Sequence, residues 1–441
     1  MCGIAGYVAP GPVPANLAGK RPRAMNVLVL YDRRSTFTNT VFEHLSAFAA
    51  HSRHRHLFLD GADDFAIDGV PQAFDAVVVH YSVRVAFGQL SDGLMRRLAG
   101  YAGRKLLFVQ DEYDMTERTR RTIEELGIDT VFTVVPERHR ELVYPAARFP
   151  RVRFVTTLTG FVPMDRPAAH ALPPLAGRPL QIGYRGRALP YWYGDLGQEK
   201  QSIGLAMRRE CERRGLRCDI EWEEKRRIYG AAWTRFLLSC RATLGSESGS
   251  NRFDADGSVQ RAVREQLARR PGASYAEVRR AVWGDAPEIP VMNQVSPRVF
   301  EAAALKTALV LYEGDYSGVV RPEEHFIALR KDHANADDVF RRLADTAGLQ
   351  RMVERAYADV IESGRYAYAA FVADYDRALD ADSVTASAGS LPADARLTAH
   401  PLRYQPTAAF RMLVRAWLGV PESARAKLRP ISRRLRRMLD S

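Results

Sequence analysis

Short apolar runs alternate along the chain with longer stretches in which apolar residues recur at helical spacing. In the first third of the chain the apolar runs cover residues 25–32, 76–80, 105–110 and 130–134, and the helical patterns cover 38–49, 92–101 and 116–126. Continuous apolar strands that alternate with helices are typical of a parallel sheet covered by helices on both faces. The pattern therefore predicts a doubly wound α/β domain.

A proline-rich break over residues 163–179 interrupts this alternation, which then resumes. The later strands are predicted at 180–183, 218–220, 242–244 and 308–312, and the later helices at 198–214, 296–306, 348–361 and 366–379. Residues 259–283 are mostly charged and helical, which predicts a surface insertion. The fold class is therefore α/β, with two Rossmann-like doubly wound domains that face each other across a cleft.

The same pattern sets the expected domain boundaries. Residues 1–24 are rich in Gly, Pro and Ala and are predicted to be a flexible N-terminal extension. The first domain is expected over 25–170, a linker over 171–179 and the second domain over 180–380. Residues 381–441 are predicted to form a linker and a basic amphipathic tail.

Composition narrows the class of protein. The 441 residues are 46% hydrophobic and 26% charged, as in ordinary globular proteins. The 4 cysteines form no CxxC pair, which argues against a zinc site or a disulfide framework and fits a cytoplasmic protein. No apolar run approaches the roughly 18–20 residues that cross a bilayer, and the first residues lack the pattern of a signal peptide.

The positive charge is concentrated at the C-terminal end of the chain. The net charge is +12, and residues 402–441 hold ten Lys or Arg against two acidic residues, which leaves a local charge of 10 − 2 = +8. This distribution argues against nucleic acid as a partner. Residues 408–439 fit either a basic amphipathic helix on an anionic membrane surface, with the protein peripheral to the inner face of the membrane, or a helix packed on the body with a solvated end.

Candidate binding residues follow the predicted strands, because ligands of open parallel sheets bind outside the carboxyl ends of the strands. Arg185 and Arg187 follow a strand beside two glycines and suit a diphosphate, although solvated arginines on a surface turn are an alternative. Ser296 is a good N-cap before a proline at the first helical position, which predicts a helix start that attracts an anion. Glu301, one turn later, suits ribose hydroxyls, or it is an exposed helical glutamate.

Further candidates lie in loops around the predicted cleft. His80 and Asp111 follow strands of the first domain, where an imidazole or a carboxylate could take a proton from an acceptor hydroxyl. Glu247 and Ser248 lie in a Gly/Ser loop and are secondary candidates for donor contacts, with a flexible surface loop as the alternative. Asp254 and Asp256 form an Asp-x-Asp pair, but the two-domain pattern is the wrong fold for a required metal, so no metal site is predicted.

Several segments of the second half resemble one enzyme family. The segments are IGYRGRALPYWYGDLGQEKQSIG, SPRVFEAAALKTALVLYEGDYSGVVRPEEHFIALRKDHANADDVF and IESGRYAYAAFV. They are similar to the nucleotide-sugar half of a retaining-type glycosyltransferase of the GT-B fold, most of all to the spore-maturation-like branch of the group 1 enzymes. The similarity covers residues 178–376 and, more loosely, 25–170.

The resemblance implies roles for individual residues. It implies that Glu301 holds the nucleotide ribose, that Arg185 or Arg187 with Lys200 neutralises the diphosphate, and that the 313–318 loop, including Tyr316, lies by the nucleotide. The family carries a glutamate, which contacts the donor sugar, where this chain has Asn293. This departure puts the donor sugar and the stereochemical course in question.

The expected activity is transfer of a sugar from a nucleotide-diphosphate sugar to a glycan, a lipid-linked or another hydroxyl acceptor, in the biosynthesis of cell-surface polysaccharide or glycan. The resemblance implies a retaining course. No cofactor or metal is expected to be required, since cationic side chains and a helix start can stabilise the leaving diphosphate. Because Asn293 replaces a glutamate, a non-catalytic nucleotide-sugar-binding or assembly protein of the same fold is the alternative.

The first eight residues, MCGIAGYV, resemble the start of class II glutamine amidotransferases of the asparagine synthase type, in which the cysteine becomes the nucleophile. That fold needs well over a hundred further residues, whereas an α/β domain begins here at Met25. We therefore favour a fusion remnant or a start-site artefact. A glutaminase that uses Cys2 is the less favoured alternative.

Overall fold

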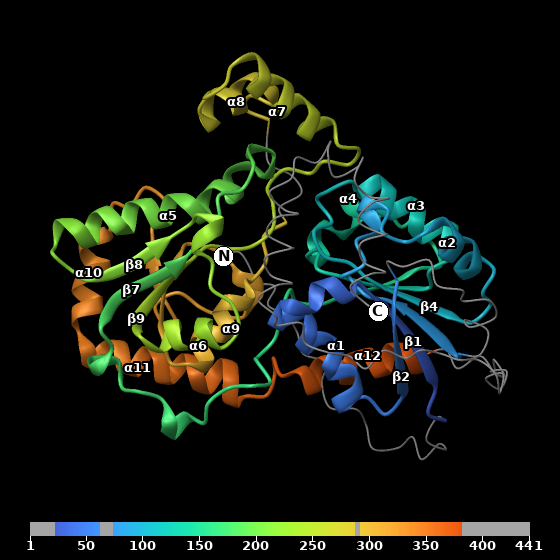
Figure 1. Ribbon diagram of the computed structural model, residues 1–441, viewed down its shortest axis with the longest axis horizontal. Helices are drawn as coiled ribbons and strands as arrows, with labels where there is room; N and C mark the ends of the chain where they lie inside the picture. Colours follow the sequence, from blue (N-terminus) through green and yellow to red (C-terminus); the bar gives the residue numbers. More distant parts are fainter. Residues whose placement is uncertain (1–22, 62–73, 287–291, 382–441) are drawn as a thin grey trace, which may run out of the picture.

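The computed structural model describes residues 23–61, 74–286 and 292–381, which form two parallel β-sheets covered by helices (Figure 1). The expected fold class, two Rossmann-like doubly wound domains that face each other across a cleft as in GT-B proteins, is confirmed. The MCGIAGYV start, with Cys2, and the basic tail at 408–439 lie outside the described residues. The predictions made for them therefore remain predictions.

The first domain contains a six-stranded sheet in the order β2-β1-β3-β4-β5-β6. All of its strand pairs are parallel. Its strands are β1 (Asn26–Tyr31), β2 (Arg55–Asp60), β3 (Ala76–Val79), β4 (Arg104–Phe108), β5 (Thr130–Thr133) and β6 (Arg153–Thr156). The helices between them are α1 (Asn39–His51), α2 (Asp92–Ala99), α3 (Thr116–Leu126) and the short α4 (Arg140–Val143).

Successive residues of the central strands face opposite sides of the first sheet, and both sides are buried. In β1, Leu28 and Leu30 belong to the core that α2 and α3 cover, whereas Val27 and Val29 belong to the core beneath α1. A strand that is buried on both faces needs apolar residues at every position. This requirement explains the continuous apolar runs of the sequence.

The second domain contains a five-stranded sheet in the order β11-β10-β9-β7-β8, again with parallel pairs. Its strands are β7 (Leu180–Arg185), β8 (Cys218–Glu221), β9 (Cys240–Gly245), β10 (Ala308–Tyr312) and β11 (Ile327–Leu329). Its helices are α5 (Gly194–Arg213), α6 (Ala231–Leu238), α7 (Ser258–Arg269), α8 (Tyr275–Val282), α9 (Pro297–Ala304), α10 (Ala336–Ala344) and α11 (Thr346–Ala356), which continues as a π-helical stretch over Tyr357–Glu362.

The last described helix, α12 (Tyr368–Asp380), packs on the first domain, although we expected residues 180–380 to form the second domain alone. Figure 1 shows α12 in orange-red beside α1. Its Phe371 and Tyr375 lie in the same core as Phe48 of α1 and Phe108 of β4. Helical spacing identifies an apolar face but not the sheet that the face covers, so this return was not predicted.

The segment after β9 crosses to the first domain and is here called the strap, residues 246–286. It contains α7 and α8, which lie at the top of Figure 1. Asp254 donates its backbone N–H to the Tyr113 carbonyl and accepts the Met115 N–H on its own carbonyl, both at 2.8 Å. The predicted surface insertion at 259–283 is therefore part of a segment that joins the two domains by main-chain hydrogen bonds.

Candidate active site between the two domains

A cavity of about 400 Å³ lies between the two domains, at the carboxyl ends of strands from both sheets. Its charged lining residues are Arg84 and Asp111 of the first domain and Arg187, Lys200, Arg227 and Arg298 of the second. Asp111 is the only carboxylate in this described lining. The cavity is therefore strongly cationic, and most of its positive charge belongs to the second domain.

Arg187 and Lys200, both predicted donor residues, face this cavity. Arg187 is exposed just beyond the end of β7 and has no ion-pair partner within the part of the chain that the structure describes. The Lys200 Nζ donates to Ser248 Oγ at 3.3 Å. Burial, together with the positive charge of Arg298, lowers the pKa of Lys200 to about 8. An ammonium that is desolvated beside other cations is stabilised by a bound anion.

The backbone around Lys200 approaches β7 closely. A Cβ atom at Gly186 would lie 2.7 Å from the Lys200 carbonyl oxygen, and the Tyr184 hydroxyl donates to the same oxygen at 2.9 Å. The glycine after β7 therefore allows α5 to bring Lys200 to the cavity. The group that approaches Gly186 closely is therefore protein backbone.

The N-terminus of α9 also faces the cavity. Pro297 occupies the first turn, and Ser296 precedes it in an extended conformation but makes no side-chain cap hydrogen bond. Ser296, Arg298 and Val299 line the cavity. Ser296 is thus placed where the sequence predicted a helix start that attracts an anion, and its hydroxyl is not used to cap the helix.

Arg185, the other predicted diphosphate ligand, does not line the cavity. Its guanidinium pairs with the Asp219 carboxylate at 2.6 Å, donates to the Arg226 carbonyl at 3.1 Å and stacks on the Phe236 ring. Only 8% of Arg185 is exposed. Arg185 lies on the face of β7 opposite to the adjacent Tyr184, which lines the cavity. Its donors are already used inside the second domain.

Glu247, Asn293 and Tyr316 form a polar cluster next to the cavity rather than part of its lining, in which Glu247 and Tyr316 are buried and Asn293 is half-buried. The Asn293 amide donates to Glu247 Oε2 at 2.5 Å, and Glu247 Oε1 accepts the backbone N–H of Tyr316 at 2.8 Å and of Asp315 at 3.1 Å. Tyr316 is fully buried and donates its hydroxyl to the Tyr312 carbonyl. The donor contact expected of Tyr316 is therefore not available to its side chain. Glu247 holds the 313–318 loop in place.

Ser248 lies in the cavity lining, next to that cluster. Its backbone pairs with Gln294 through two hydrogen bonds of 2.7 Å. This pairing connects the loop after β9 to the segment before α9. The structure thus fixes Ser248, which the sequence placed either in a donor site or in a flexible loop.

Glu301 lies one turn into α9 and is not part of the cavity lining. The Trp233 indole N–H donates to Glu301 Oε2 at 2.7 Å. Burial raises the pKa of Glu301, against the opposing effects of the Trp233 hydrogen bond and the Arg298 charge. The Trp233 hydrogen bond uses one carboxylate oxygen of Glu301 and leaves the other for a ribose hydroxyl. The ribose contact therefore stays a prediction.

The two candidate bases of the first domain, His80 and Asp111, differ in their access to the cavity. His80 is fully buried, with Nδ1 2.8 Å from Ser82 Oγ and Nε2 3.1 Å from His44 Nδ1, and burial holds its pKa well below the usual range. It has no access to a substrate. Asp111, in contrast, is exposed and lines the cavity. We therefore do not retain the catalytic role expected of His80.

Several lining residues were not predicted from the sequence, namely Arg84, Tyr193, Arg227 and Arg298. Arg298 directly follows Pro297, and its position in the first turn of α9 could have identified it as a residue that faces the cavity. Arg84 lies in a loop without a sequence signal, and Tyr193 ends a short 3-10 helix over Tyr191–Tyr193. Tyr113 of the first domain contacts Tyr193 of the second, with ring centroids 5.5 Å apart, so the two tyrosines form an aromatic wall across the domain boundary.

The Asp-x-Asp pair of the strap is used for backbone hydrogen bonds. The Asp254 carboxylate accepts the N–H groups of Val259 and Gln260 at 3.2 and 2.9 Å, which caps α7. Elsewhere Glu324, His325 and Asp359 form a group of metal-ligand composition. Arg355 already pairs with Asp359 at 2.7 Å, so arginine neutralises part of this group.

No family model and no curated protein match this sequence. In fold the chain is similar to an alpha-glucosyltransferase in complex with UDP-glucose and DNA containing an abasic site, with 9% identity over 82% of this chain and 100% of that one and a TM-score of 0.47. It is also similar to Anabaena HepE in complex with UDP-glucose, with 11% identity over 81% of this chain and 100% of that one and a TM-score of 0.42. The corresponding values for OtsA are 12% identity, 81% of this chain, 99% of that one and a TM-score of 0.42. Values this low assign no activity to the chain.

A last observation concerns membranes. Across residues 23–61, 74–286 and 292–381, no helix combines the length and the apolar character that a bilayer crossing needs.

Proposed function

We propose that the protein is a glycosyltransferase that takes a sugar from a nucleotide-diphosphate sugar bound in the cavity between its two domains. The observation that carries the proposal is the group of cations from the second domain, Arg187, Lys200 and Arg298, at the start of α9. Cations and a helix start stabilise the charge that develops on a departing diphosphate. The proposed donor site needs no metal for this step.

Individual donor contacts follow from the geometry and the resemblance together. Arg187, Lys200, Ser248 and Ser296 are proposed to bind the diphosphate, and Glu301 to bind the ribose beside Trp233. Glu247 and Asn293 are proposed to act through the 313–318 loop, which they hold by hydrogen bonds. Arg185 and Tyr316 are left out, since their polar groups are satisfied inside the protein.

The acceptor is proposed to be a glycan, a lipid-linked or another hydroxyl compound, which enters from the first domain. A role in cell-surface polysaccharide or glycan synthesis in the cytoplasm, at the membrane through the basic tail, is part of the same proposal and rests on the sequence. The second candidate is a non-catalytic nucleotide-sugar-binding protein. It is favoured by Asn293, whose amide is bonded to Glu247 and supplies no carboxylate.

Calorimetric binding of UDP, GDP, ADP, CMP and TDP tests the donor site. We expect one nucleotide to bind, and Arg187→Ala and Lys200→Ala each to weaken it by about 1–3 kcal/mol, which is the usual loss for a charged hydrogen-bond partner. Glu301→Ala tests the ribose contact, with the same expected loss. Arg235→Ala is the matched control, because Arg235 is exposed on α6 outside the cavity lining.

The binding and hydrolysis results distinguish the two candidate functions. If none of the nucleotides binds to the wild-type protein, the donor site does not exist and the proposed function fails. If a nucleotide binds but its sugar conjugate is neither hydrolysed nor transferred, the non-catalytic binding protein is favoured instead.

A further inference from the structure

In the proposed transfer the acceptor hydroxyl loses a proton, either to the departing diphosphate or to a group of the protein, and the described cavity lining offers one carboxylate for the second route. Asp111 lies directly after β4 at the first-domain side of the cavity, and half of its side chain, 51%, is exposed. The cations proposed to hold the diphosphate lie on the second domain. Asp111 therefore faces the donor from the opposite domain, and its charge is near enough to Lys200 to favour the ammonium there.

The backbone of Asp111 adopts a conformation that side chains rarely take. Its φ is +60°, in the left-handed region. Such a conformation costs a non-glycine residue free energy and persists only where neighbouring contacts impose it. Asp111 is thus a strained residue whose carboxylate is directed to a cavity.

Two residues that follow Asp111 are held by hydrogen bonds. Glu112 is buried and accepts hydrogen bonds from the Thr133 hydroxyl at 2.5 Å and from the Val134 N–H at 3.1 Å. Asp114, two residues further along, accepts from the Tyr193 hydroxyl at 3.2 Å and from Gln260 Nε2 at 3.1 Å, which belong to the second domain. The loop is therefore held by both domains at once.

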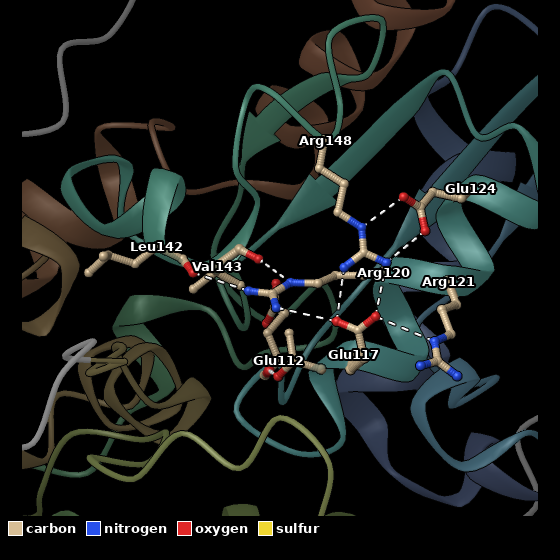
Figure 2. Close-up of polar contacts among 9 residues, drawn as sticks. Glu112, Glu117, Arg120, Arg121, Glu124, Leu142, Val143 and Arg148 are labelled. Atoms are coloured by element: carbon tan, nitrogen blue, oxygen red, sulfur yellow. Dashed lines mark hydrogen bonds and ion pairs between the residues drawn. The ribbon is translucent and has the colours of Figure 1, made fainter.

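The helix that follows the loop is anchored as well. Arg148 pairs with Glu117 and Glu124 of α3 at 2.9 and 2.7 Å, and Arg120 donates to the carbonyl groups of Val143 and Leu142 (Figure 2). These contacts tie the start of α3 to the 142–148 segment. The backbone on the C-terminal side of Asp111 has little freedom to move.

The carboxylate itself is also held. The Tyr113 hydroxyl donates to Asp111 Oδ1 at 2.6 Å, and Arg84 lies 3.8 Å from Oδ2. Both partners line the same cavity. An acceptor hydroxyl beside the Tyr113 ring would meet this carboxylate.

Three other candidate groups, Glu247, Glu301 and His80, are buried or already hydrogen-bonded. Glu247 already accepts three hydrogen bonds, Glu301 lies outside the lining and is bonded to Trp233, and His80 is buried. A retaining enzyme that works by double displacement needs a carboxylate on the donor side to attack the sugar. The described donor-side lining contains none.

Building on the proposed function, we propose that Asp111 is the general base of the transfer and that the anomeric configuration of the sugar is inverted in a single displacement. The Asp111 carboxylate takes the proton of the acceptor hydroxyl, whose oxygen bonds to the anomeric carbon. The bond from that carbon to the diphosphate oxygen breaks, and its electron pair leaves with the diphosphate. This course differs from the retention that the sequence resemblance implies.

The first test uses water as the acceptor and needs no variant. The wild-type protein is given the α-linked nucleoside diphosphate glucose of the nucleotide that binds best, and proton NMR follows the released glucose before it mutarotates. Inversion releases β-glucose first. Release of α-glucose first overturns the inference, while the donor site stands.

The second test is Asp111→Asn. We expect hydrolysis to slow by at least about 100-fold, as for the loss of a general base, with unchanged nucleotide affinity. Azide needs no deprotonation, so the variant should form β-glucosyl azide at the wild-type rate. A merely structural role would lower azide transfer together with hydrolysis. Unchanged hydrolysis in Asp111→Asn would also refute the proposal, and Glu125→Gln, an exposed acid of the same domain, is the control.

Discussion

Lys200 illustrates how one buried side chain sets a pH dependence. Its pKa of about 8 results first from burial and then from the positive charge of Arg298. The group is therefore cationic below pH 8 and loses its charge as the pH rises through 8. A bound diphosphate favours the cation and raises this pKa, so nucleotide binding takes up a proton near pH 8.

We predict that nucleotide affinity is constant up to about pH 7 and falls by up to about tenfold at pH 9, since one pKa unit corresponds to a factor of ten. Tyrosines 184 and 193 in the same cavity do not contribute, because burial raises the pKa of both well above this range. Calorimetry in buffers of different ionisation enthalpy measures the proton uptake. Lys200→Met should bind weakly at every pH, and a variant that keeps the decline would refute the assignment.

For individual residues, the sequence predicted the region of the site better than it predicted which side chains line the cavity. Arg187 and Asp111 reach the cavity as expected from residues that follow strands. Arg185 is only two positions before Arg187, yet the strand turns it toward Asp219. His80 likewise follows a strand but packs against His44. Which side chains reach the cavity depends on the pleat and on partners far away in the sequence, which a local pattern does not contain.

Among the elements, the strap does more than cover the surface. Asp254 joins it to the first domain through its backbone and caps α7 through its carboxylate. Gln260 of the strap also donates a hydrogen bond to Asp114, in the loop that contains Asp111. The geometry of the proposed base therefore depends on a segment of the opposite domain.

We predict that Asp254→Ala lowers the stability of the protein by about 1 kcal/mol, as for the loss of a helix cap, and slows donor hydrolysis several-fold while nucleotide affinity stays unchanged. Denaturant titration, hydrolysis kinetics and calorimetry measure these three effects. Asp254→Asn keeps one acceptor oxygen and should recover part of the activity. Glu265→Ala, at an exposed acid on α7, is the matched control. Loss of nucleotide affinity in Asp254→Ala would show that the strap supports the donor site instead.

The pattern of apolar residues predicted the interior strands and the edge strand β8 but missed β2, β6 and β11. Each of them lies at an edge of its sheet. An edge strand is less completely buried and tolerates charged residues, as in the sequence RHLFLD of β2. The strap and the return of α12 were missed for another reason, since both depend on contacts with the other domain.

At the scale of the whole molecule, the two domains are joined at separate places. On one side the Val162 N–H donates to the Tyr366 carbonyl at 2.9 Å, where the connection between the sheets passes the approach to α12. On the other side Asp254 pairs with the loop that contains Asp114. A hinge that closes a cleft needs one end free to move, so these contacts oppose closure.

We predict that saturating nucleotide leaves the radius of gyration unchanged, as measured by small-angle X-ray scattering. Asp254→Ala serves as the comparison, because it weakens one of the two connections and should allow a change. A clear decrease of the radius in the wild-type protein would contradict this prediction and indicate that the domains close over the nucleotide.

The return of α12 to the first domain also bears on how the protein is made. The buried residues of α12, Phe371 and Tyr375 among them, complete a core whose remaining members lie before residue 162. On the ribosome, the first sheet emerges long before the helix that covers it, and the second domain is synthesised in between. The first domain therefore waits with an uncovered apolar face until almost the whole described chain has been translated. During that interval it should be a substrate for chaperones, and fragments that end before α12 should aggregate.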